Sequence, residues 1–222
     1  MRGVTLIEIV ITSALSLIIA MAVGTLVVAG NRAWHSTYDS TFGQLQTDGV
    51  ALTTAFGSVG RRANRLSYSL YKIANGKLVV AEPTTPNSEE AVFGDAVEFR
   101  YWDVELDAQD SKGVMDSSKV ATAYALFYLD GGKVKVDYGP YPPGAIPAGA
   151  KSGTRNTSGV STKVLAENVS HDPDSTEGIF SHTTINGVGQ GSIRINLVLT
   201  DPDTEETMRV TTATMLRNVW PR

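Results

Sequence analysis

The sequence contains no cysteine and only three histidines, His35, His171 and His182. The absence of cysteine excludes a disulfide framework and thiolate chemistry, and it leaves the redox compartment of the protein open. No G-x-S-x-G, H-E-x-x-H or Walker pattern accompanies the histidines. The sequence therefore holds no recognisable nucleophile or zinc motif, and we expect a protein that is not an enzyme and has no cofactor.

Basic residues are also scarce. The chain has 19 lysines and arginines against 23 aspartates and glutamates, which gives a formal net charge of -4. A broad nucleic-acid-binding surface is normally basic, so nucleic acid is not expected as a primary ligand.

Charge is missing altogether from Ile9 to Gly30. As a helix that rises about 1.5 Å per residue, this run is long enough to cross a bilayer core of about 30 Å. Glu8 stands directly before it, and a charged side chain within a transmembrane helix costs roughly 2.5 to 3.5 kcal/mol on insertion scales. Hydrolysis after Gly3 would leave a free amine on Val4, which could neutralise Glu8.

The order of Gly3, then Val4 to Glu8, then an apolar helix resembles the class III signal of type IV prepilins and pseudopilins. The resemblance implies a leader at residues 1–3 and cleavage by a prepilin peptidase between Gly3 and Val4. It also implies N-methylation of Val4 and a role for Glu8 in filament assembly. The sequence departs from the family at Val4, where phenylalanine is usual, and in its short leader with the single basic residue Arg2. An earlier start codon would lengthen the leader without changing this interpretation.

Two other classes of N-terminal segment remain open. A secretory signal peptide could be cleaved after Val27-Val28-Ala29, although the apolar run is longer than the roughly 7 to 15 residues of such a signal. A plain transmembrane anchor is the second alternative. The recurrence of Ser16, Ala20 and Gly24 on one helix face suits close packing between transmembrane helices, but the same pattern is common in helices without a partner.

The helix is predicted to continue through residues 31–66, after the membrane-spanning and assembly segment at residues 4–30. An alternating spacing of four and three residues, with Gly49 at one step, places apolar side chains on one face: Tyr38, Phe42, Leu45, Leu52, Phe56, Val59, Ala63 and Leu66. Acidic residues lie toward the start of this segment, and Arg61, Arg62 and Arg65 lie at its end, as the helix dipole favours. Its glycines lower helix propensity and predict bends or local melting.

Residues 67–222 are predicted to form a β-rich head that is long enough to bury its own core. Leu78–Val80 is a candidate strand, and Val97–Tyr101 alternates apolar and charged residues as a half-buried strand does. Tyr124–Leu129 and Val134–Tyr138 flank Asp130-Gly131-Gly132 and predict a hairpin. Residues 139–159 predict a surface loop. Alternation at 193–199 and 210–216 predicts a closing hairpin around Asp201-Pro202-Asp203.

The predicted fold is therefore α+β, with a long N-terminal helix, membrane-spanning in its first half, packed on an antiparallel β-sheet head in the manner of pilins. Leu165–Val169 and Leu216–Asn218 are similar to stretches of PilW-type minor pilins and J-type pseudopilins of type II secretion. The resemblance implies a structural, non-catalytic minor pilin of a type IV pilus, with a secretion pseudopilin as the alternative. Its implied partners are the prepilin peptidase, other pilins or pseudopilins, the membrane and the inner-membrane assembly platform. The protein would occupy the inner membrane as a single-pass protein with an extracytoplasmic head, then a pilus or periplasmic pseudopilus.

A membrane-anchored extracytoplasmic binding module is the alternative from another class. Acidic turns at residues 172–177 and 201–206 supply the oxygen ligands that calcium prefers. Asp201, Asp203 and Glu205 are thus weak calcium candidates. Asp-Pro is a turn former, so the second of these turns is predicted to be a plain hairpin connection without a metal.

Overall fold

The computed structural model describes residues 5–85, 89–103, 121–141, 152–153, 158–171, 178–186, 188–202 and 204–216, with the side chains of 37–42 and 66–67 excepted. The chain divides into two compact units, Met1–Gln44 and Leu45–Arg222. Helix α1, Leu6–Arg62, contributes residues to both units. The predicted leader and Val4 lie outside the described residues.

The first unit contains an apolar helical segment, Leu6–Ser36, that is long enough to cross a membrane. All of its side chains are exposed, including the large apolar ones that a soluble helix would bury. This confirms the prediction of one candidate N-terminal transmembrane helix. It is the only such helix found in the described part of the chain.

The second unit begins with the remainder of α1, whose apolar face is buried as the spacing predicts. Leu45, Leu52, Phe56 and Val59 all lie in the core. Of the predicted bends or local melting, local melting is not observed, since α1 continues through its glycines as one helix. Close packing explains why a glycine occupies position 60, because a Cβ atom there would lie 2.3 Å from the side chain of Thr214.

Helix α1 ends at Arg62, earlier than the predicted end at Leu66. Strand β1, Ala63–Ala74, follows directly, so Ala63 and Arg65 are strand residues. The helical face stops here because the following segment pairs with the neighbouring strand β4 (Ala96–Tyr101), with Ala63 opposite Tyr101 and, beyond a register shift, Leu70 opposite Val97. Pairing with the sheet therefore overrides the helical spacing at the last steps of the predicted face.

Seven antiparallel strands form the larger sheet in the order β7-β2-β1-β4-β5-β6-β8. Besides β1 they are β2 (Lys77–Val80), β4 (Ala96–Tyr101), β5 (Ala123–Asp130), β6 (Lys133–Pro140), β7 (Ser152–Gly153) and β8 (Ser161–Ala166). The strands predicted at residues 78–80 and 97–101 are confirmed, and so is the hairpin of β5 and β6. Gly131 and Gly132 both have positive φ, which the two-residue turn of this hairpin requires. Most of the loop predicted at residues 139–159 lies outside the described residues, but the prediction is wrong where β6 continues to Pro140 and at β7.

The second sheet has the order β12-β11-β10-β3, with β9 paired to β11. Its strands are β3 (Glu90–Gly94), β9 (Val169–Ser170), β10 (Phe180–Ile185), β11 (Val188–Thr200) and β12 (Thr207–Met215). The long pairing of β11 with β12 confirms the predicted closing hairpin. All pairings in both sheets are antiparallel, so the predicted α+β class holds in the described residues, with sheet predominating.

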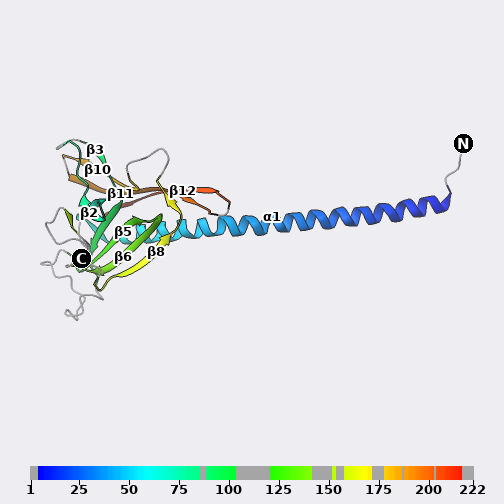
Figure 1. The fold of residues 1–222 in the computed structure, drawn as a ribbon, viewed down its shortest axis with the longest axis horizontal. Coiled ribbons are helices and arrows are strands. Elements are labelled where there is room, and N and C mark those ends of the chain that lie inside the picture. Colours follow the sequence, from blue (N-terminus) through cyan, green and yellow to red (C-terminus); the bar gives the residue numbers. More distant parts are fainter. Residues whose placement is uncertain are drawn as a thin grey trace. The chain divides into compact units, whose positions relative to one another are not determined.

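Phe56 joins α1 to both sheets. Its ring meets Phe99 of β4 and Phe127 of β5 edge-on at 5.5 Å, and it stacks on Phe180 of β10 at 6.0 Å between ring centroids. Figure 1 shows the corresponding cyan end of α1 between β10–β12 and strands β5, β6 and β8. The two sheets and the end of α1 thus share one core.

The opposite face of the seven-stranded sheet is also buried, around Tyr71, Tyr124 and Leu126. Because both faces are covered, the prediction that β4 is half-buried is wrong: Glu98 is 0% exposed. Arg100 donates a hydrogen bond from Nε to Glu98 Oε1 at 2.6 Å. Burial raises the pKa of Glu98, and Arg100 opposes that shift. The pair is needed because an unpaired carboxylate at this depth would cost several kcal/mol.

Candidate functional sites

Glu8 lies in the first turn of α1 and caps the N-terminal end of the helix. Its Oε2 accepts hydrogen bonds from the backbone N–H of Thr5 at 3.2 Å and from the Thr5 hydroxyl at 3.1 Å. A Thr-x-x-Glu sequence in which the glutamate returns to the first residue is half of a capping box. The carboxylate also lies at the positive end of the helix dipole. Glu8 is therefore well placed as a cap, quite apart from any role in assembly.

The nearest cations and aromatic rings along the helix lie at the other end of the apolar segment. No charged residue occurs from Ile9 to Asn31, a length of about 34 Å as helix, and Arg32 and the exposed Trp34 follow it. Arginine and tryptophan are typical of membrane–water interfaces. Glu8 and Arg32 bracket a span slightly longer than a bilayer core, so in a membrane-spanning helix Glu8 would lie near the interface and not deep in hydrocarbon.

The turn between β11 and β12 is organised by Asp201. Its Oδ1 accepts the backbone N–H of Thr204 at 2.9 Å, and its carbonyl accepts that of Glu205 at 3.0 Å. Asp201 is buried, whereas Glu205 is exposed and has a positive φ. Asp203 and the acidic turn at 172–177 lie outside the described residues. No group of three potential metal ligands occurs among the residues that are described.

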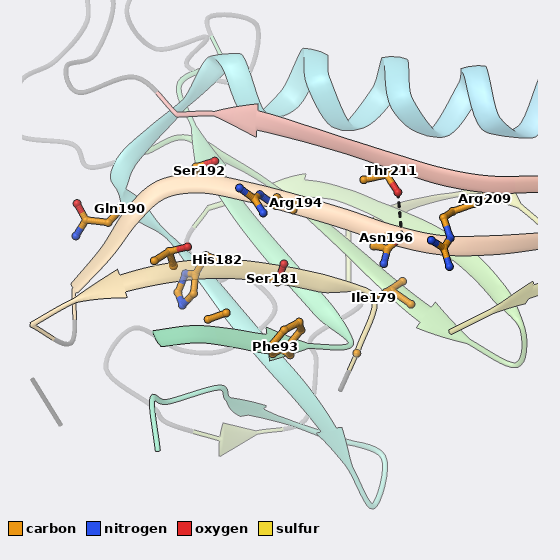
Figure 2. A pocket seen from close by; sticks show the side chains of 13 residues that line it. Phe93, Ile179, Ser181, His182, Gln190, Ser192, Arg194, Asn196, Arg209 and Thr211 are labelled. Atoms are coloured by element: carbon orange, nitrogen blue, oxygen red, sulfur yellow. Dashed lines mark hydrogen bonds between the residues drawn. The ribbon is translucent and has the colours of Figure 1, made fainter. Parts of the chain in front are cut away.

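A polar groove lies on the face of the five-stranded sheet that points away from α1 (Figure 2). Its volume is about 870 Å³. Four strands supply the side chains that define it: Phe93 from β3, Ser181 from β10, Arg194 and Asn196 from β11, and Arg209 and Thr211 from β12. The described residues that line it include two arginines and no carboxylate.

Strand register accounts for the arrangement of these side chains. Phe93 lies opposite Ser181 and Ser181 lies opposite Arg194, so the three share one row across the sheet. Asn196 and Thr211 form the next row on the same face, and the Thr211 hydroxyl donates a hydrogen bond to Asn196 Oδ1 at 3.0 Å. Side chains along β11 alternate between the two faces of the sheet. Arg194 and Asn196 face the groove, whereas Ile193, Ile195 and Leu197 face the core.

A half-buried histidine lies at the margin of the groove. Nδ1 of His182 is 2.7 Å from the hydroxyl of Tyr68, and the rings meet edge-on. Nε2 of His182 is buried and has no hydrogen-bond partner among the described residues. Burial lowers the pKa of His182 to about 4 and raises the pKa of Tyr68. His182 is therefore neutral at physiological pH and unsuited to hold a positive charge.

The predicted site residues that the structure describes are distributed over both units: Glu8 belongs to the first, and Asp201 and Glu205 belong to the turn between β11 and β12 in the second. His171 lies 3.7 Å from Asp95. The sequence analysis missed the groove and the Tyr68–His182 pair. The polar residues at alternate positions of β11 were a signal for the groove, although their partners on other strands require the sheet register. Comparisons with protein-family models, with curated proteins and with solved structures found no match.

Proposed function

We propose that the chain is a non-catalytic minor subunit of a type IV pilus, stored in the inner membrane and drawn into a filament after peptidase cleavage. The observation that carries the proposal is the single carboxylate of Glu8 at the start of a fully exposed helical segment that carries no further charge before Arg32. Such a helix needs an apolar environment along its whole surface. A bilayer supplies it before assembly, and the helices of neighbouring subunits would supply it afterwards.

Glu8 has a specific part in this proposal. Cleavage after Gly3 would place a new amine on the residue directly before Thr5, whose N–H is 3.2 Å from Glu8 Oε2. Covalent geometry then keeps the amine and the carboxylate of one chain within about 7 Å. At an effective dielectric constant near 20, opposite charges at that separation attract by about 2 kcal/mol before desolvation. Neutralisation of this kind would ease transfer of the helix end into the interior of a filament.

A J-type pseudopilin of type II secretion would use the same helix in the same way, and it is the alternative within this class. Both forms have the prepilin peptidase, sister subunits and the inner-membrane assembly platform as partners. The groove favours a second candidate from another class, a membrane-anchored extracytoplasmic binding module. That candidate needs neither cleavage after Gly3 nor a special role for Glu8.

Intact-mass analysis of the protein from its native host separates a filament subunit of either kind from the binding module. The filament proposal predicts a chain that starts at Val4 and carries one methyl group. Gly3→Phe should block processing because the peptidase must approach the backbone closely at the cut, whereas Glu8→Gln should still be processed. A native N-terminus at Met1, or one beyond Ala29, would refute the proposal.

A further inference from the structure

We propose that the groove on the five-stranded sheet binds an acidic polysaccharide through Arg194 and Arg209. This inference goes beyond the filament function and does not depend on it. It rests on the charge of the groove, the spacing of its arginines, and the neutral polar side chains between them.

The charge of the groove is opposite to that of the chain. The protein carries a net charge of -4, yet the described lining of the groove contains two exposed arginines and no acidic side chain. Within the described residues Arg194 makes no ion pair. An arginine fork is suited to paired hydrogen bonds with a carboxylate. The groove therefore favours a ligand with carboxylate groups.

The spacing of the arginines favours an extended ligand. Arg194 lies opposite Ala213, and Arg209 lies opposite Val198 on the neighbouring strand. Arg209 is thus displaced by four positions along the sheet, about 13 Å at strand rise. A polymer with an acidic group on successive units can bridge backbone positions this far apart and contact both guanidinium groups.

The groove floor between the arginines matches sugar chemistry. The Asn196 amide and the Thr211 hydroxyl lie there, and Ser181 and Phe93 occupy the adjoining row. Figure 2 shows these side chains on neighbouring strands of the same sheet. Amides and hydroxyls both donate and accept, as sugar hydroxyls require, and Phe93 adds an apolar surface for a sugar ring. Two cations on an acidic chain are few for nucleic acid, whose binding depends on neutralising many phosphates.

The test measures binding of polygalacturonate to the full chain in detergent micelles at low ionic strength, with neutral dextran and single-stranded DNA as comparison ligands. We expect polygalacturonate to bind and dextran not to bind. Arg194→Gln should weaken binding at least about tenfold, since it removes a charge-assisted hydrogen-bonding group. Arg61→Gln is the matched control, because Arg61 is an exposed helix residue outside the groove. It should leave binding unchanged.

Both substitutions are at exposed side chains, so equal melting temperatures should verify that the variants fold. Absence of polygalacturonate binding by the wild-type chain would overturn the proposal. So would equal binding of dextran, tighter binding of DNA, or an equal loss of affinity in Arg61→Gln.

Discussion

Acidification should destabilise the second unit through His182. The pKa of this histidine is lowered to about 4 by burial, from 6.5 for the free side chain. The folded state therefore binds fewer protons than the unfolded state. Stability from the neutral ring is complete above pH 6.5 and is lost as the pH falls from 6.5 toward 4.

The magnitude follows from the two pKa values. A shift of this size corresponds to about 3 kcal/mol in full, and the part lost between pH 7 and pH 5 is about 2 kcal/mol. Partial exposure of the ring reduces this figure, so we expect a loss of roughly 1 to 2 kcal/mol. Among the described residues Nε2 has no hydrogen-bond partner and Nδ1 meets the Tyr68 hydroxyl, so neither nitrogen is hydrogen-bonded to an acidic group that would stabilise the charged ring.

His182→Asn removes the titration and keeps an oxygen that can accept the Tyr68 hydroxyl. Urea unfolding of the full chain in detergent, followed by circular dichroism at pH 7, 6 and 5, measures the effect. The free energy of unfolding of the variant should fall less between pH 7 and pH 5 than that of the wild type. Thr183→Ser, at an exposed, non-titrating neighbour of His182 on β10, is the control and should keep the wild-type slope. Identical slopes for wild type and His182→Asn, or a wild type that gains stability in acid, would refute the reasoning.

Three further predictions concern other parts of the chain. Glu8→Gln should spare membrane insertion and cleavage but lower recovery in sheared filaments; if Glu8 only caps the helix, the change costs at most about 1 kcal/mol and incorporation equals wild type. Gly60→Ala should destabilise the second unit by about 1 to 3 kcal/mol in thermal unfolding, because its Cβ would overlap Thr214. Gly57→Ala, whose Cβ would make only an ordinary 3.6 Å contact, should be neutral or stabilising. A larger loss of stability in Gly57→Ala than in Gly60→Ala would contradict the packing argument. Calcium should leave the melting temperature unchanged, and a rise abolished by asparagine at Asp201 and Asp203 would reveal a site.

Local patterns predicted the elements whose partners are close in sequence. The hairpin of β5 and β6 needs only two alternating runs and Gly131-Gly132, and the closing hairpin is equally local. Burial of Glu98 was not predictable, because period-two alternation does not reveal whether the second face of a sheet is covered. The helix end was displaced for a similar reason: Ala63 fits the helical spacing, but pairing of β1 with β4 decides its conformation.

The candidate sites also differ in whether their residues are close together in the sequence. Glu8 is recognisable from a short sequence because its partners, Thr5 and the apolar run, are its neighbours. Tyr68 and His182 are 114 residues apart, and no local period relates them. The groove combines side chains from four strands, so its recognition requires the order β12-β11-β10-β3 as well as the register.

The continuity of α1 has a consequence for hydrogen exchange. One uninterrupted helix carries its last turns, from Leu45 to Arg62, in a folded core and its first turns on a fully exposed surface. In detergent, amides around Leu52 and Phe56 should exchange only when the second unit opens globally. Amides near Thr25 report the local fraying of a helix that gains no stability from protein packing. A single backbone ladder should therefore display two exchange regimes, with the change between them near Gln44.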